Sequence, residues 1–382
     1  MSLAYGTKLR PDPTRVVWFE SDPFVLSMGP QHPATWGVIR LRLTLDGEQV
    51  VGVEPEVGYL HRGIEKCAEV RTVRGILPLA TRVDILSPYF MECLVCLGVE
   101  EMLGVEVPTR ARYLRVVVME LNRILSHLFW WGLYGWDLGA ETPLFLAGRE
   151  REKLLALLEE LSGSRYLPSY IVPGGVRRDL PPEWPGRVLE FLAELDYRLV
   201  EYRDLLSDNS IFQARTRRVG VLGAETAIAF GVTGPNLRAS GVAMDLRAEP
   251  GFLAYPELGV EPVVEEGGDA LSRYRVRMGE IEQAAGLVRR ALENLPEGPI
   301  REEVGPDPKL PPGEVFVEVE SPRGRLGMLL VGDGSPYPVR VHFRPPSLAS
   351  LFALDEMLRG HYMADVVAVL GSIDPMVAEI DR

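Results

Sequence analysis

Residues 109–131, TRARYLRVVVMELNRILSHLFWW, decide the fold class. Their apolar side chains recur in steps of three and four, which places a continuous apolar stripe along one face of a helix. Thr109 is a residue type that caps helix N-termini well. The stripe consists of Leu114, Val117, Val118, Leu121, Leu125 and Leu128. The pattern therefore predicts a long helix, ending near Trp131, that buries this face against other helices.

Two further segments have the same rhythm, and a charged one fits between the first two. One begins after Pro185, the other includes Tyr274, and residues 148–163, GREREKLLALLEELSG, form the charged segment. Helices with such apolar seams pack side by side. The apolar positions are Val188, Leu192, Leu195, Leu199, Tyr202 and Leu206 in the first, and Tyr274, Met278, Ile281, Ala285, Val288, Leu292 and Leu295 in the second. We expect a helical bundle.

Strand signals stand at both ends of the chain. Residues 38–45, VIRLRLTL, alternate apolar and polar side chains, and Asp46-Gly47 is a hairpin turn signal before a returning strand in residues 49–58. Residues 314–320 and 339–344 alternate in the same way. The expected fold is mainly α (α+β): a central helical bundle with small antiparallel sheets near the N- and C-termini.

We expect three regions. Residues 1–60 form an N-terminal β region, residues 61–300 the helical bundle, and residues 301–382 a C-terminal α+β region. The stretch 296–313 is rich in proline, glycine and charge, and it reads as a linker.

Composition narrows the possible partners. The chain has 382 residues, 46% of them hydrophobic and 25% charged, so a sizeable core is expected and disorder is not. Its net charge of −13, without a basic block, argues against nucleic acid as a partner. The charge-free stretch 124–136 is shorter than the roughly 20 apolar residues of a membrane helix. We expect a soluble chain whose link to a membrane comes through a partner.

The sequence carries no complete set of residues for metal binding or catalysis. Neither of the usual phosphate-binding glycine loops occurs, so this chain is not expected to hold NAD or ATP through them. Cys93 and Cys96 form a C-x-x-C in an apolar segment, and only Cys67 remains elsewhere. A zinc or iron–sulfur site needs about four ligands, so buried thiols are favoured over a metal site. Three cysteines fit a reducing cytoplasmic setting. His127, in an apolar helix, is expected to be a hydrogen-bonded core histidine.

Several polar residues of the first 140 positions stand in loops and at helix ends. The loop 29–37, GPQHPATWG, is rich in residues that are costly to hold rigid unless something docks there. Asp137 follows an apolar helix and is either a cap for the next turn or a buried group with a partner. The stretch 58–66, GYLHRGIEK, is either a solvated helix start or presents a cation to a partner's cofactor. Such a pattern suits a subunit that completes a site together with another protein.

Ordered segments along nearly the whole chain resemble the D subunit of the proton-pumping NADH:quinone oxidoreductase, respiratory complex I. That family shares its fold with the large subunit of nickel–iron hydrogenases. The segments are GPQHPATWG (29–37), GYLHRGIEK (58–66), ATRVD (80–84), PTRARYLRVVVMELNRILSHL (108–128), YIVPGG (170–175), LRASGVAMDLR (237–247), SPRGRLGMLLVGDGSPYPVRV (321–341) and SIDPMVAEIDR (372–382).

The resemblance implies a peripheral subunit on the cytoplasmic side of the cell membrane, inside an NADH dehydrogenase that acts as a translocase. The chain itself would bind no cofactor, and quinone would be the substrate. The terminal [4Fe-4S] cluster would belong to a small iron–sulfur subunit, with other peripheral-arm subunits and the membrane arm as further partners. The implied quinone-pocket residues are His32, Trp36, Ile85 and Asp137, and the implied cluster-proximal residues are Arg62, Arg82, Asp84 and Leu167.

This sequence departs from the family pattern where the acceptor should dock. Trp36 and Leu167 stand where the family has histidines, and Ile85 stands where it has a tyrosine. The segment DPMVAE (374–379) replaces the cysteines that hold nickel in hydrogenases, so hydrogenase activity is not expected. The alternative is a divergent structural subunit of a related membrane-bound oxidoreductase or hydrogenase-like complex that does not reduce quinone in the usual pocket.

Three local features are expected as well. Arg82 and Asp84 can form a local ion pair. Asp137, without a histidine partner, should have a raised pKa. The aromatic residues near the loop 29–37 should leave an exposed aromatic surface on the lone chain; they are Trp36, Trp130, Trp131, Tyr134 and Trp136.

Overall fold

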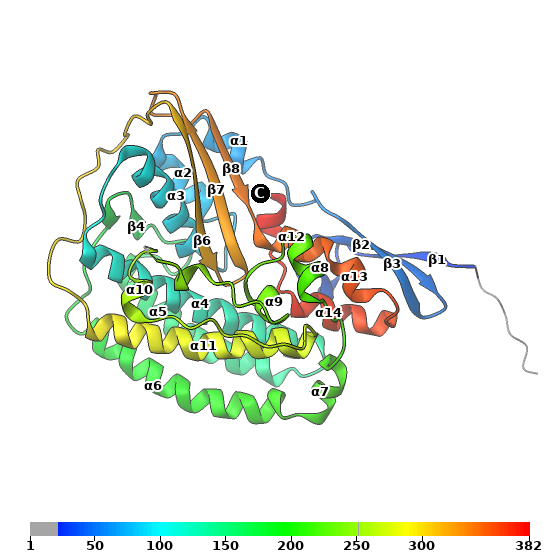
Figure 1. Cartoon of the computed structure of the whole chain (residues 1–382). Coiled ribbons are helices and arrows are strands. Elements are labelled where there is room, and N and C mark those ends of the chain that lie inside the picture. Colours follow the sequence, from blue (N-terminus) through cyan, green and yellow to red (C-terminus); the bar gives the residue numbers. More distant parts are fainter. Residues whose placement is uncertain (1–21, 251) are drawn as a thin grey trace, which may run out of the picture.

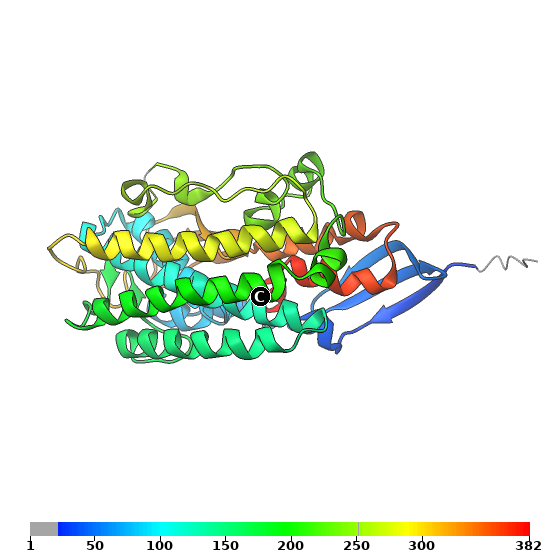
Figure 2. The ribbon, with the colours of Figure 1, turned by 90° about the horizontal axis from the view of Figure 1, so that it is seen from below.

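Four long helices lie side by side in the computed structural model, which describes residues 22–250 and 252–382. They are α4 (Thr109–Asp137), α5 (Thr142–Ser162), α6 (Trp184–Tyr202) and α11 (Ala270–Glu293), and Figure 2 shows from below that the long helices of the bundle run alongside one another. The helix α4 is the centre of the bundle, in contact with both α5 and α11. The predicted bundle is confirmed.

The helix α4 ends six residues later than we predicted, at Asp137 instead of Trp131. Gly132 and Gly135 lie in this last part, and glycine is a poor helix former. They are needed for packing, because a Cβ on Gly132 would lie 2.9 Å from the Cα of Leu144 at the start of α5. The close approach of α5 thus stabilises helical turns that the local sequence alone does not favour.

The N-terminal sheet has three antiparallel strands, β1 (Phe24–Met28), β2 (Arg40–Asp46) and β3 (Gln49–Glu56), in that order. The hairpin β2–β3 is as predicted, whereas β1 was not predicted. Leu41, Leu43 and Leu45 point into a core shared with the C-terminal helices, and the far end of the sheet projects from the body (Figure 1). Residues 1–21 of the expected N-terminal region lie outside the described residues.

A second antiparallel sheet packs on α3 (Pro88–Leu103) and consists of β6 (Gly313–Ser321), β7 (Gly324–Gly332) and β8 (Arg340–Arg344). We predicted β6 and β8. The strand β7 was missed because its sequence, GRLGMLLVG, is a glycine-interrupted apolar run without alternation.

Short elements connect these parts. The hairpin of β4 (Ile171–Val172) and β5 (Gly175–Val176) lies beside residues 300–302. The other helices are α1 (Ile64–Ala68), α2 (Val73–Ala80), α7 (Ser210–Thr216), α8 (Ala224–Ala229), α9 (Gly234–Arg238), α10 (Tyr255–Leu258), α12 (Pro346–Phe352), α13 (Leu354–Leu358), α14 (Val366–Ser372) and α15 (Val377–Asp381).

The core contains a buried charge network that we did not predict. Glu280 of α11 accepts hydrogen bonds from Arg238 at 2.6 Å and from His127 Nε2 at 2.9 Å. Arg238 also donates to Glu320 at 2.7 Å, and all four side chains are fully or almost fully buried. The prediction of a hydrogen-bonded core histidine at His127 is confirmed. Sequence spacing does not single out these carboxylates, because their partners lie far away in sequence.

Candidate functional site

The loop 29–37 is held rigid by its own hydrogen bonds. His32 caps the 3₁₀ turn Pro33–Thr35, and its Nδ1 accepts the N–H of Ala34 at 3.2 Å. The Thr35 hydroxyl is 2.8 Å from the carbonyl oxygens of both His32 and Gly37. Gly29 has φ +93°, and a Cβ there would lie 2.1 Å from the carbonyl oxygen of Ile39. The loop therefore presents Trp36, at φ 57°, in a fixed direction.

Trp36 reaches the end of α4. Its indole Nε1 donates a hydrogen bond to the Asp137 carboxylate. Partial burial raises the pKa of Asp137 to about 6, while the Trp36 hydrogen bond and the nearby His32 act in the opposite direction. The capping alternative for Asp137 is wrong, since the residue preceding α5 is Glu141. The expectation of a raised pKa is confirmed.

Ile85 and Leu167 lie together in a second, small apolar pocket. Ile85 is 40% exposed, and the pocket is also lined by Leu86, Tyr89 and Tyr166. Tyr166 brings a phenol into the pocket that Ile85 lines, although Ile85 itself replaces the tyrosine of the family pattern. The Tyr166 hydroxyl accepts a hydrogen bond from Arg151. We did not predict Tyr166 as a pocket residue from the sequence. The one hint was its position next to Leu167, which the family resemblance had singled out.

The C-terminal segment bridges these two places. A Cβ on Gly37 would lie 2.6 Å from Val377 Cγ2, so the loop 29–37 packs tightly on α15. Met376 and Ala378 pack with Leu86, next to Ile85. His32 lies apart from Ile85 and Leu167, in a cavity of ≈ 580 Å³ that it lines with Leu26, Met28 and Met363. Of the four implied quinone-pocket residues, the structure thus joins Trp36 directly to Asp137 only.

The implied cluster-proximal residues have backbone partners. Arg62 donates to the carbonyl oxygen of Arg82 at 2.9 Å and to that of Ala378 at 3.0 Å. The Arg82 guanidinium donates to the carbonyl oxygen of Pro78. The local pair of Arg82 with Asp84 is therefore wrong, because Asp84 is fully buried and takes another partner.

That partner is Arg323 in the turn between β6 and β7. Its Nη1 lies 3.0 Å from Asp84 and its Nη2 3.3 Å from Asp374. Asp84 also accepts the N–H groups of Leu86 and Ser87 at 3.0 and 3.1 Å. We did not predict the ion pairs of Arg323 with Asp84 and Asp374 from the sequence. Both Arg323 and Asp374 nevertheless lie in segments that carry the family resemblance.

The cysteines of α3 are unsuited to metal binding. Cys93 and Cys96 are buried, as predicted, and burial raises the pKa of the Cys93 thiol to about 12. Thiols, not thiolates, therefore occupy this position at neutral pH. Across residues 22–250 and 252–382, no group of three or more His, Cys, Asp or Glu side chains is arranged to hold a metal ion.

The expected exposed aromatic surface is wrong for most of its residues. Trp130, Trp131 and Tyr134 are fully buried, and Trp130 Nε1 donates to the carbonyl oxygen of Gly371 at 2.8 Å. Trp136 is 48% exposed. The buried surface of α4 is wider than the predicted apolar stripe, because α5, α11 and α14 (Val366–Ser372) all pack against this helix.

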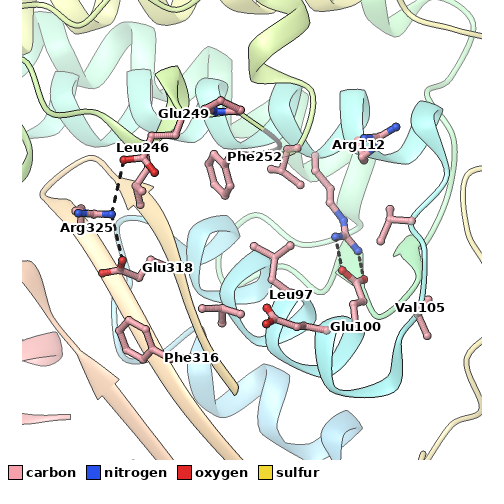
Figure 3. Close-up of a pocket in the computed structure, with 16 residues that line it drawn as sticks. Leu97, Glu100, Val105, Arg112, Leu246, Glu249, Phe252, Phe316, Glu318 and Arg325 are labelled. Carbon is pink, nitrogen blue, oxygen red and sulfur yellow. Dashed lines mark hydrogen bonds and ion pairs between the residues drawn. The ribbon is translucent and has the colours of Figure 1, made fainter. Parts of the chain in front are cut away.

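A cavity of ≈ 500 Å³ lies at the opposite end of α4 (Figure 3). Two of its arginines form ion pairs with glutamates of the same cavity: Arg115 with Glu100, and Arg325 with Glu318 and Glu249. From Arg115 to Asp137 the helix spans about 22 residues, or about 33 Å at its rise per residue. This cavity is therefore separate from the contact between Trp36 and Asp137.

The fold thus consists of a helical bundle, two flanking antiparallel sheets and a loop fixed against the end of α4. The sequence matches the family described as "Respiratory-chain NADH dehydrogenase, 49 Kd subunit" over residues 137–306 and 302–382, and the chain belongs to that family. It is 44% identical over 362 residues to the D subunit of the NADH-quinone oxidoreductase of Geobacillus thermodenitrificans, covering 94% of this chain and 99% of that protein.

Two further proteins are similar to this chain. The chain is 41% identical to the H subunit of the chloroplastic NAD(P)H-quinone oxidoreductase of Eucalyptus globulus, covering 94% of this chain and 98% of that protein. A solved structure of the membrane-bound sulfane sulfur reductase, an archaeal respiratory membrane complex, contains a chain with a TM-score of 0.90 and 39% identity. The match covers 94% of this chain and 99% of that one. Within the described residues, none of the helices combines the length and apolarity that crossing a membrane requires.

Proposed function

We propose that this chain lines the chamber in which a complex I type enzyme reduces its terminal acceptor, with quinone as that acceptor. The terminal [4Fe-4S] cluster belongs to the small iron–sulfur partner, and this chain supplies walls and a proton-exchanging group. The observation that carries the proposal is the contact of Trp36, on a rigid loop, with Asp137. That contact joins two of the three segments that contain the implied quinone-pocket residues.

Each side chain then has a definite task. Trp36 offers an aromatic face against which a ring stacks. Asp137, with a pKa of about 6, exchanges protons near neutral pH and supplies a proton when a quinone takes up electrons from the cluster. Ile85 and Leu167 provide apolar wall but no hydrogen bond. Reduction of one quinone consumes two electrons and two protons, so at least one more proton arrives from elsewhere in the complex.

The location and coupling follow from the same proposal. The subunit is peripheral, on the cytoplasmic side of the cell membrane, and contacts other peripheral-arm subunits and the membrane arm. Electron transfer in the chamber drives ion translocation in that arm. NAD is bound by other subunits of the complex.

A second candidate is a related membrane complex whose acceptor is not quinone. The observation that favours it is the apolar pair Ile85 and Leu167, which offers a quinone carbonyl no donor. The similarity to a chain of a sulfane sulfur reductase points in the same direction. The relatives named as quinone oxidoreductases support the first candidate.

One experiment separates the two. The assembled complex is reduced with dithionite, and its reoxidation rate is measured with a short-chain quinone and, separately, with polysulfide. The double variant Trp36→His with Ile85→Tyr restores two hydrogen-bonding groups, each contributing about 1–3 kcal/mol at a buried polar ligand. If quinone is the acceptor, this variant should lower the KM for quinone by about tenfold or more, since 1.4 kcal/mol corresponds to a factor of ten.

The control is Ile211→Tyr, which adds a phenol at a 71% exposed position of α7 and should leave quinone reduction unchanged. Fast reoxidation of the unaltered complex by polysulfide but not by quinone would favour the second candidate. An unchanged KM in the double variant, with quinone already reduced quickly by the unaltered complex, would refute the proposed roles of Trp36 and Ile85.

A further inference from the structure

A cavity of ≈ 430 Å³ lies between α2, the β4–β5 hairpin and residues 301–308. Three arginines, Arg74, Arg177 and Arg301, line it together with apolar and proline side chains. Its volume falls within the range of small-molecule sites, roughly 300–1,000 Å³. None of its lining residues belongs to the contact between Trp36 and Asp137.

These three guanidinium groups have no acidic partner. Among residues 22–250 and 252–382, no carboxylate oxygen lies within 4.0 Å of the side-chain nitrogens of Arg74, Arg177 or Arg301. Arg115 and Arg325 of the cavity in Figure 3 differ, because each forms an ion pair with a glutamate that lines the same cavity. Arg74, Arg177 and Arg301 are exposed, and as three unpaired cations lining one cavity in a chain of net charge −13 they give it a local positive charge that attracts anions.

The acidic residues nearby do not neutralise the cavity. Glu302, Glu303 and Asp307 are on the same segment, but none of them lines the cavity or pairs with its arginines. Glu92 is close enough to interact with Arg177, but burial raises the pKa of Glu92 to about 8. At pH 7 that carboxyl is therefore mainly neutral, and the cavity keeps its positive charge.

The backbone fixes two sides of the cavity. Glu302 N–H donates to the carbonyl oxygen of Gly174 at 2.8 Å, which holds the segment that carries Arg301 against the hairpin. A Cβ on Gly174 would lie 2.3 Å from the Glu302 carbonyl oxygen, so the two backbones touch. Arg177 N–H donates to the carbonyl oxygen of Tyr170 at 2.9 Å, and its Nη2 donates to Ser169 Oγ at 2.8 Å. The Arg177 guanidinium is thus held by one side-chain hydrogen bond, and the backbone next to Arg301 is fixed against the hairpin, before any ligand arrives.

We propose that this cavity binds a small polyanion of the phosphate class, such as a pyrophosphate or a phosphorylated metabolite. Planar guanidinium groups donate pairs of hydrogen bonds to phosphate oxygens, and three of them match a ligand with several negative charges. The apolar residues Val73, Leu77 and Val172 provide a wall for an uncharged part of such a ligand. Anion binding at this cavity does not depend on which acceptor the complex reduces, so it can be tested separately from the proposed function.

The test is calorimetric titration of the full chain with pyrophosphate at about 0.15 M salt, a condition that screens non-specific attraction. We expect saturable binding that weakens at least tenfold in each of the variants Arg74→Ala, Arg177→Ala and Arg301→Ala. The matched control is Arg178→Ala, which removes an exposed arginine next in sequence that does not line the cavity. It should change the affinity less than twofold.

Absence of saturable binding, or an equal loss in Arg178→Ala, would overturn the proposal. The same titration is repeated on the assembled complex, where retained binding supports a small ligand. If pyrophosphate binds the free chain but not the complex, an acidic segment of a partner subunit occupies the cavity, and the small-ligand proposal is wrong.

Discussion

Replacing Trp36 by phenylalanine removes the indole N–H that binds Asp137 and keeps an aromatic ring at the same position. A hydrogen bond to a charged group contributes about 1.5–3 kcal/mol to stability when it is buried. Asp137 is only partly buried, so solvent screening reduces this figure, and we expect a loss of about 1 kcal/mol. Because Trp36 lowers the pKa of Asp137, the variant should raise that pKa above its present value of about 6.

The effect depends on pH in a definite direction. A carboxyl whose pKa is raised on folding, from about 3.9 to about 6, binds more protons in the native state. Its contribution to stability is therefore complete below pH 4 and is lost as the pH rises through 6. The N–H of Trp36 matters most when Asp137 is charged, so Trp36→Phe should destabilise the chain more at pH 8 than at pH 4.5.

Thermal unfolding of the full chain at both pH values measures this difference. The control is Trp136→Phe, since the Trp136 indole N–H makes no hydrogen bond to a described residue. Equal losses of Tm at pH 4.5 and pH 8, or a loss equal to that of the control, would refute the Trp36–Asp137 interaction as described. The variant Asp137→Asn should abolish the pH dependence that the pair contributes.

Three other variants or measurements test the core. Arg323→Met leaves Asp84 and Asp374 buried without their cation, and denaturant unfolding should show a loss of about 3–5 kcal/mol; a loss under 1 kcal/mol contradicts the network. Burial lowers the pKa of His127 to about 4, so NMR should find its imidazole neutral at pH 6. The contribution of the neutral imidazole to stability is lost only as the pH falls from about 6.5 towards 4. A titration midpoint near 6.5 would contradict this. Gly174→Ala forces a Cβ to 2.3 Å from the Glu302 carbonyl oxygen at φ +85°, so Tm should fall, whereas an unchanged Tm would show that the hairpin relaxes freely.

Local periodicity was enough to predict the helical bundle and the outer strands. The steps of three and four in α4, α6 and α11 report faces that are buried against neighbours. The same reasoning ended α4 early, because the apolar stripe that it followed stops at Leu128, whereas the close approach of α5 at Gly132 and Gly135 extends the helix to Asp137. It also missed β7, whose two faces are largely buried, so that its sequence does not alternate.

The candidate site was predicted less completely than the fold. Trp36 and Asp137 were singled out separately, and their hydrogen bond joins residues 101 positions apart. Asp84 was paired with the wrong arginine, because its partner Arg323 lies 239 positions away. Sequence spacing does not report such pairs, since only the packing of α4, β7 and the C-terminal segment brings them together.

The most direct test of the central claim is a structure of the assembled complex with its acceptor bound. We predict that the acceptor's reacting group lies in van der Waals contact, about 4 Å, with Trp36 or Ile85, on the side of Asp137 that faces the partner's [4Fe-4S] cluster. An acceptor bound elsewhere, with Trp36 and Asp137 remote from both the acceptor and the cluster, would contradict that claim.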